Sequence, residues 1–313
     1  MSYGKKTKIK YMKFIESFLD KGVIEFGNIL DTKKCNKIYT EILKTRDWSQ
    51  NLFRNQKEVM EDPDPKNTNP GKGVNNLAEK YDLTFVETNP ILKENIEKLI
   101  GADYEILLKN FVVGVPDIWI PEWLKKITEK QLTANLGPYI KKEFRDVTYF
   151  RGIDYHMDLI DHANAVGDNL TLYVYLNDVD ANMSPLHIIE KSHIFGGTKF
   201  PHFLKNDIEE KIEYGSSENN FKKFNKKILT GKTGNVYLWS SFILHGTRPQ
   251  SSETARISLR YDIKTNSKNN NANLLINEFL KRIDGNLSLT SVRDDIDLNS
   301  SDHKQVKFKK ILK

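Results

Sequence analysis

The sequence contains one cysteine, Cys35, in 313 residues. A single thiol cannot form a disulfide within the chain or supply a zinc site built from several cysteines. The longest apolar runs are only a few residues long, far short of the roughly 18 that cross a bilayer, and none follows the basic start MSYGKKTKIK as in a secretory signal. We therefore expect no disulfide framework and no membrane association, and a cytoplasmic location fits best.

Several common functional motifs are also missing. The chain has no GxGxxG, no P-loop and no GxSxG, so the usual signals for dinucleotide binding, nucleotide hydrolysis and serine hydrolases are lacking. The net charge of +6 comes largely from lysines near the two ends, and no basic stripe interleaved with aromatic residues is present. The sequence therefore does not indicate a nucleic-acid partner. Its 38% hydrophobic and 29% charged residues indicate a globular chain with a sizeable core.

Strand patterns dominate the chain after a helical start. Residues 104–115 form a branched apolar run typical of a buried strand, and 170–176 and 256–263 alternate with a period of two. Further strands are expected around 236–238 and at 242–244. Many short strands after a helical start predict a mainly β fold with flanking helices, a sandwich or closed roll rather than a parallel βαβ sheet.

These patterns predict one domain over residues 1–283. Its N-terminal part, 1–103, is expected to be largely helical. The β core, 104–265, is expected to carry a helical insertion at 116–146, because helical patterns separate two strands there. The polar segment 284–313 is expected to form a C-terminal tail.

One short motif offers metal ligands. His156 and Asp158 are two apart in a segment expected to be a strand, where residues i and i+2 project to the same side. Two histidines and one carboxylate are the ligand set of non-haem iron(II) oxygenases. The pair alone is weak evidence, because so short a motif also arises by chance. The alternative is a hydrogen-bonded or surface histidine.

A second histidine and an arginine follow near the end of the β region. His245 ends an apolar strand, and Arg256 opens the next alternating strand. Arg256 and Ser258 lie on the face opposite the apolar one, where a buried guanidinium needs a partner. A bound dicarboxylate would form a bidentate salt bridge with the arginine. The alternatives are an internal ion pair with Asp154 or Asp262, or an exposed sheet face.

Over residues 18–263 the chain resembles the phytanoyl-CoA dioxygenase superfamily of Fe(II)- and 2-oxoglutarate-dependent oxygenases. His156 and Asp158 stand where the family has its H-x-D motif, and His245 stands at its distal histidine. Arg256 matches the family's 2-oxoglutarate arginine in spacing and strand. The stretch LTLYVYLNDVDANMSPLHIIEKSH resembles the family's strand–turn–strand, with Glu-Lys in place of the usual Pro-Gly.

The resemblance implies a double-stranded β-helix core, a jelly roll of the cupin type. It implies that the two histidines and the aspartate bind Fe(II), and that Arg256 and Thr247 hold the distal carboxylate of 2-oxoglutarate. Tyr173 falls where an aromatic residue lines the co-substrate pocket, and Lys109 falls near a position that can contact 2-oxoglutarate. Ser258, on the same face as the arginine, is a further candidate for binding it.

The implied activity is that of a dioxygenase that converts 2-oxoglutarate and O2 to succinate and CO2 while it hydroxylates a small soluble metabolite. The first alternative is a non-catalytic or isomerase-type cupin-like protein that binds a small molecule. Arg256 and Thr247 favour the oxygenase, because a pure binding module needs no oxoglutarate anchor. A third hypothesis is a demethylase that acts on nucleic acid or protein. His162 is a candidate for the pocket mouth, and the substrate and any oligomer cannot be read from the sequence.

Overall fold

The structure of the chain is a computed structural model that describes residues 13–63, 75–161, 169–265 and 274–287. The strands are β1 Val23–Asn28, β2 Glu105–Gly114, β3 Thr133–Asn135, β4 Thr148–His156, β5 Asn169–Tyr175, β6 Leu186–Ile189, β7 Phe203–Ile208, β8 Lys211–Ser217, β9 Asn220–Leu229, β10 Asn235–Ser240, β11 His245–Thr247 and β12 Arg256–Lys264. They pair in the order β1-β10-β5-β12-β2-β4-β11-β6-β9-β8-β7, and β3 pairs with β4.

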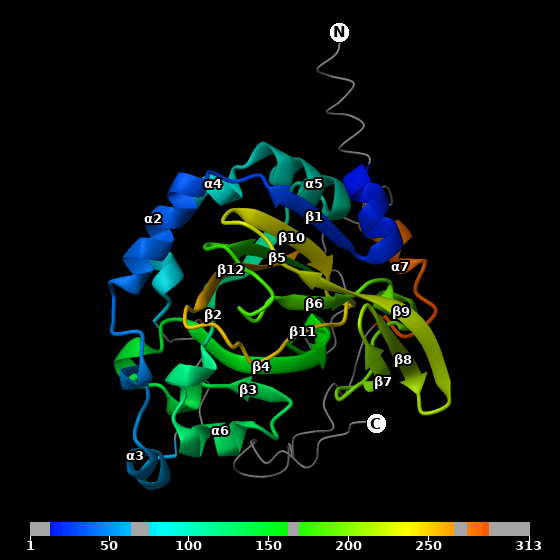
Figure 1. Cartoon of the computed structure of the whole chain (residues 1–313). Helices are drawn as coiled ribbons and strands as arrows, with labels where there is room; N and C mark the ends of the chain where they lie inside the picture. Colours follow the sequence, from blue (N-terminus) through cyan, green and yellow to red (C-terminus); the bar gives the residue numbers. More distant parts are fainter. Residues whose placement is uncertain (1–12, 64–74, 162–168, 266–273, 288–313) are drawn as a thin grey trace.

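Two facing sheets form a roll within this order. In the first sheet β2, β12, β5 and β10 are antiparallel neighbours, and in the second β4, β11, β6 and β9 are. From β4 onward the chain crosses repeatedly between the sheets, and parallel pairing of β2 with β4 joins them at one edge. Figure 1 shows β12, β5 and β10 on one side of the roll and β4, β11 and β6 on the other. The expected double-stranded β-helix core is confirmed.

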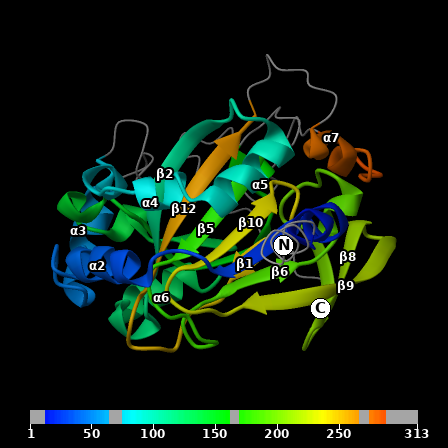
Figure 2. The same ribbon diagram turned by 90° about the horizontal axis from the view of Figure 1, so that it is seen from above.

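Several of the helices flank the first sheet. The α-helices are α2 Thr32–Leu43, α3 Gln56–Glu61, α4 Thr84–Glu87, α5 Pro90–Ile100, α6 Glu122–Thr128 and α7 Leu275–Leu280, and residues 13–21 are also helical. Short 3-10 helices span Gln50–Leu52, Leu77–Lys80, Asp117–Trp119, Gly137–Tyr139, Lys142–Phe144, Asp158–Asp161 and Ser192–Phe195. In both ribbon views α4 and α5 lie over β10, β5 and β12 (Figures 1 and 2). No helix of the described chain is long and apolar enough to cross a membrane.

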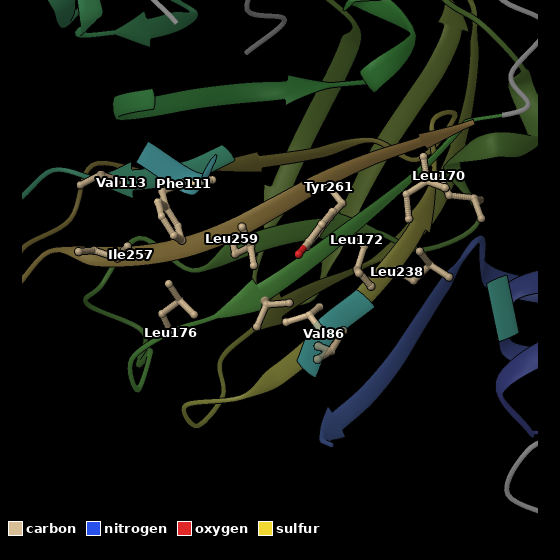
Figure 3. Close-up of a cluster of buried hydrophobic side chains, with 14 of the residues drawn as sticks. Val86, Phe111, Val113, Leu170, Leu172, Leu176, Leu238, Ile257, Leu259 and Tyr261 are labelled. Carbon is tan, nitrogen blue, oxygen red and sulfur yellow. The ribbon is translucent and has the colours of Figure 1, made fainter. Parts of the chain in front are cut away.

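The alternation of β12 separates two environments. Ile257, Leu259 and Tyr261 are buried in the large apolar cluster that also contains side chains of the helices. Figure 3 shows them with side chains of the neighbouring strands. A second, smaller cluster holds Tyr173 of β5 and Trp239 of β10 together with apolar residues of β6. Because β5 and β10 belong to one sheet and β6 to the other, this second cluster lies inside the roll. The two-residue period thus divides the strands of the first sheet between the helix side and the interior.

Some sequence expectations need correction. Residues 242–244 are not a strand: they lie in the turn between β10 and β11, where they are fully buried. The insertion at 116–146 contains one α-helix, short 3-10 turns and the strand β3, so it is less helical than expected. The jelly roll also carries a β7–β8 hairpin beyond β9, which the sequence analysis did not predict. Most of the tail at 284–313 lies outside the described residues.

Candidate metal centre

Three side chains, from two strands and the 3-10 helix that follows the first, converge in the interior of the roll. His156 is the last residue of β4, His245 is the first of β11, and the two are direct partners in the antiparallel ladder. Their ring centroids lie 4.3 Å apart. One ligand atom from each histidine and from Asp158 can be chosen so that all lie within 4.8 Å of one another, close enough to hold one metal ion.

Asp158 reaches this group in a different way from that expected. The sequence analysis placed His156 and Asp158 on one face of a single strand, but β4 ends at His156 and Asp158 begins a 3-10 helix. The change of backbone direction brings the carboxylate to the histidine pair. Its Oδ1 lies 3.6 Å from Nε2 of His245.

Backbone carbonyls orient both imidazoles for metal binding. Nδ1 of His156 lies 3.0 Å from the carbonyl oxygen of Asp154, and Nδ1 of His245 lies 3.0 Å from that of Ile243. A carbonyl can only accept, so each Nδ1 carries a proton, and in the neutral ring Nε2 then keeps a lone pair for a metal. Burial and the nearby His245 lower the pKa of His156 to about 3, which keeps its ring neutral.

Three side chains hold the carboxylate of Asp158. Thr171 and Trp239 donate hydrogen bonds of 2.6 and 2.9 Å to Oδ2, and Arg260 donates one of 3.0 Å to Oδ1. Burial opposes ionisation, but the attraction of His245, Arg260 and His156 outweighs it and holds the pKa of Asp158 below its usual value. Two of the three donors bond to Oδ2, and Oδ1 is the oxygen that lies 3.6 Å from Nε2 of His245. The sequence analysis gave no role to Thr171, Trp239 or Arg260.

Arg256 is buried inside the same roll. The residue is 1% exposed, and its Nη1 donates a 2.9 Å hydrogen bond to the hydroxyl of Tyr173. No carboxylate of the described residues pairs with Arg256, and its Nε has no hydrogen-bond partner there. Of the sequence alternatives, Asp154 pairs with Arg248 instead, and an exposed sheet face is ruled out by the burial.

A chain of aromatic contacts links the arginine to the metal ligands. The ring of Tyr173 lies 5.7 Å from that of Trp239, and Trp239 lies 4.9 Å from the ring of His245. Ser258, fully buried on β12, and Thr247, buried on β11, both have hydroxyls without a partner among the described residues. The structure therefore places Tyr173, Ser258 and Thr247 on strands of the same roll as the metal ligands.

Lys109 does not join this group. It pairs with Tyr261 in the β2–β12 ladder, on the helix-facing side, and its Nζ lies 3.3 Å from a carboxylate oxygen of Glu87. A shift of one position along a strand reverses the side on which a residue lies, and the interior position here is Asn110, opposite Arg260. His162 lies outside the residues that the structure describes.

The donor set fits a divalent metal ion and a dicarboxylate. Two neutral imidazoles and one ionised carboxylate, grouped on one side, suit iron(II) and leave other coordination positions for further ligands. A buried guanidinium without a carboxylate is costly, and an anion that accepted hydrogen bonds from it would remove that cost. Gly114 leaves room for the guanidinium of Arg256, because a Cβ there would lie 3.2 Å from its Nε.

Comparison with known proteins supports the fold. No family model and no curated protein matches the sequence. Among solved structures, the epimerase SnoN in complex with Fe3+, alpha ketoglutarate and nogalamycin RO has a TM-score of 0.50 at 11% identity, over 82% of this chain and 84% of that chain. The two proteins share a fold.

Two further solved structures have lower scores. AviO1 from Streptomyces viridochromogenes has a TM-score of 0.45 at 14% identity, over 82% of this chain and 96% of its own. The non-heme monooxygenase ThoJ in its Ni complex has a TM-score of 0.42 at 11% identity, over 80% of this chain and 77% of its own. At such identities the likeness concerns the fold alone, so membership of the phytanoyl-CoA dioxygenase superfamily stays a prediction.

Proposed function

We propose that this protein is an Fe(II)- and 2-oxoglutarate-dependent dioxygenase that hydroxylates a small molecule. The observation that carries the proposal is the buried Arg256, which has no carboxylate partner among the described residues and lies in the same roll as a His-Asp-His group. A protein that bound only a metal, or only an uncharged ligand, would leave this buried charge uncompensated. A dicarboxylate that bridges from the metal to the arginine accounts for both features.

The chain itself binds and orients the reactants. Nε2 of His156, Nε2 of His245 and Oδ1 of Asp158 bind the metal, because these atoms converge and carry no proton. Iron with 2-oxoglutarate supplies the oxidising chemistry, with succinate and CO2 as co-products. The three ligand residues are each at most 9% exposed, so bulk water is kept from the reacting groups.

Arg256 anchors the distal carboxylate of 2-oxoglutarate in this proposal. Its guanidinium is held by Tyr173, and the hydroxyls of Ser258, two positions along the same strand, and of Thr247 on β11 lack partners in the described chain. A charged donor and two hydroxyl donors suit a carboxylate, which only accepts hydrogen bonds. SnoN, which shares the fold, was solved with Fe3+ and alpha ketoglutarate, and this supports the same ligands here.

The direct test is succinate formation from 2-oxoglutarate with Fe(II) and O2. We expect the wild-type protein to form succinate, and His156→Ala, Asp158→Ala and Arg256→Met each to lose this activity. His187→Ala is a matched control, because His187 lies on β6 opposite Gly246 rather than in the triad. A panel of small molecules that stimulates turnover, followed by mass analysis of products, then tests hydroxylation. Metal binding without any succinate formation would instead favour the cupin-like binding protein.

A further inference from the structure

Arg260 donates a hydrogen bond to the oxygen of Asp158 that lies toward His245. Its Nη2 lies 3.0 Å from Oδ1, and the same Oδ1 lies 3.6 Å from Nε2 of His245. The other oxygen, Oδ2, accepts from Thr171 and Trp239. An ionised carboxylate oxygen has about two lone-pair sites, so Oδ1 can accept from Arg260 and still bind a metal ion. The guanidinium is therefore bonded to the atom that is proposed to bind the metal.

The register of β12 places Arg260 beside the metal ligands. Arg260 lies opposite Tyr173 of β5 and Asn110 of β2, on the interior face of the strand. Its side chain is 19% exposed, whereas that of Asp158 is 3% exposed. An ion pair this buried is screened much less by water and salt than one on the surface. Arg256, on the same face, lies four positions or roughly 13 Å along the strand and bonds to Tyr173 instead.

This bond has opposite consequences with and without a metal ion. In the metal-free protein the guanidinium compensates the buried charge of Asp158, which would otherwise be costly. With a metal ion on Oδ1, two positive charges share one carboxylate oxygen and repel each other. Coulomb repulsion grows with the charge of the ion, so it opposes Fe(III) more strongly than Fe(II).

We infer that Arg260 sets the preference of this centre for the ferrous over the ferric ion. Arg260 acts through Asp158, so it is a positioning residue and not a metal ligand. The inference rests on the iron centre of the proposed function, whose reaction starts from Fe(II). One electron separates the two ions, and a tenfold change in their relative affinity corresponds to about 59 mV in potential.

A role in orientation alone gives a different result. A hydrogen bond that only held the carboxylate of Asp158 in place would support both oxidation states alike, because both ions bind the same oxygen. Its loss would weaken metal binding and leave the potential unchanged. Asp262, the next residue on this face of β12, is 4% exposed and brings a negative charge. It is common to all the variants below, so their difference from wild type measures the side chain at position 260 alone.

The test is a redox titration of the full-length, iron-loaded protein without 2-oxoglutarate, followed by the EPR signal of Fe(III). Dithionite supplies the electron and ferricyanide removes it. We expect Arg260→Gln, which keeps a donor but no charge, to lower the Fe(III)/Fe(II) potential by at least about 59 mV. Arg260→Met has neither donor nor charge and should show a similar fall, whereas Arg260→Lys should keep most of the wild-type potential.

A control variant and a second titration complete the experiment. Arg282→Gln removes an exposed arginine that bonds to the carbonyl oxygen of Leu19, and it should match wild type. Co(II) titration shows whether each protein has an assembled metal site. Failure of the wild type to bind Co(II) or iron would refute the proposed centre itself.

Three results would overturn the inference while the centre stands. The first is a potential that is unchanged in the charge-free variants. The second is an equal fall in Arg260→Lys, since the charge is retained there. The third is loss of metal binding in both charge-free variants, because removal of a repulsion cannot abolish binding. If only one of those two variants binds metal, its potential is compared with that of Arg260→Lys.

Discussion

At the scale of single residues, the metal centre depends on groups that bind no metal themselves. Oδ2 of Asp158 accepts from Thr171 and Trp239, which leaves Oδ1 toward the histidines. A carboxylate held in this way keeps its orientation when a metal binds or leaves, so little ordering remains to be done on binding. Trp239 also contacts the ring of His245, so one side chain fixes the position of two ligands.

Trp239→Phe isolates the hydrogen bond to Asp158. Phenylalanine keeps an aromatic ring beside Tyr173 and His245 but has no Nε1–H to donate. We expect the affinity for Co(II), titrated by its visible absorption, to fall about 10- to 100-fold. Trp123→Phe, in α6, is the control and should bind Co(II) like the wild type. Equal affinities of the Trp239→Phe and wild-type proteins would show that the bond does not position the carboxylate.

Arg256→Met separates binding from stability. Methionine has a comparable length but no charge, so the affinity for 2-oxoglutarate should fall at least roughly 30-fold, equivalent to about 2 kcal/mol. The ligand-free variant should be more stable than wild type by about 1 kcal/mol or more, because a buried guanidinium without a carboxylate partner is removed. Calorimetric titration and urea unfolding measure the two effects. A variant that is both destabilised and unchanged in 2-oxoglutarate affinity would contradict the anchoring role.

The sequence could predict the candidate metal ligands but not the residues that hydrogen-bond to them. His156 and Asp158 are close along the chain, and His245 and Arg256 fall at characteristic positions of a known pattern. By contrast, Trp239 is 81 positions from Asp158 and Arg260 is 102 positions from it. Only the strand register brings such residues together, and register is set by packing over the whole sheet.

At the scale of elements, close approach of strands fixes the two ends of the proposed site. β11 approaches β4 so closely that a Cβ on Gly246 would lie 2.7 Å from the carbonyl oxygen of Ile153. The ladder also shifts its register between His245 and Thr247. At the other end, Gly114 of β2 makes room for the guanidinium of Arg256. Gly246 therefore lets the two strands with the histidine ligands approach each other, and Gly114 leaves space for the side chain of Arg256.

Two alanine substitutions should divide these roles. Gly246→Ala forces β11 away from β4, so we expect Co(II) affinity to fall at least tenfold, with lower stability, because His245 moves relative to His156. Gly114→Ala crowds Arg256 and should weaken 2-oxoglutarate binding while leaving Co(II) affinity within about twofold of wild type. Both ligands are titrated into both variants. The same loss pattern in the two variants would mean that the glycines act through general destabilisation.

Element prediction succeeded where a simple period decided the structure. The alternation over 256–263 correctly divided β12 into an apolar face and a face carrying Arg256. The prediction of a strand at 242–244 was wrong. These residues are fully buried in a turn, and a buried apolar run is also typical of a strand. The prediction for Lys109 failed by one position, because a continuous apolar run does not show which residues face the interior.

At the scale of the whole molecule, the roll buries several histidines as neutral rings. His193 is 2% exposed, packs 4.5 Å from the ring of Phe279, and has a pKa lowered by burial to about 4. His202 is similarly buried, with a pKa lowered to about 3. In the unfolded chain each would titrate near 6.5, so unfolding takes up protons at lower pH. The native fold is therefore sensitive to acid at histidines other than the metal ligands.

This argument gives the direction of the pH dependence. Above about pH 6.5 the histidines are neutral in both states and full stability is present. As pH falls from about 6.5 toward 4, each buried histidine should cost roughly 1.4 kcal/mol of unfolding free energy per pH unit. His193→Phe keeps an aromatic ring beside Phe279 but cannot titrate. Its unfolding free energy should therefore fall less steeply with pH, by the roughly 1.4 kcal/mol per pH unit that one histidine contributes. Urea unfolding of both metal-free proteins across this range measures the slopes, and parallel slopes would show that His193 is already protonated in the native fold.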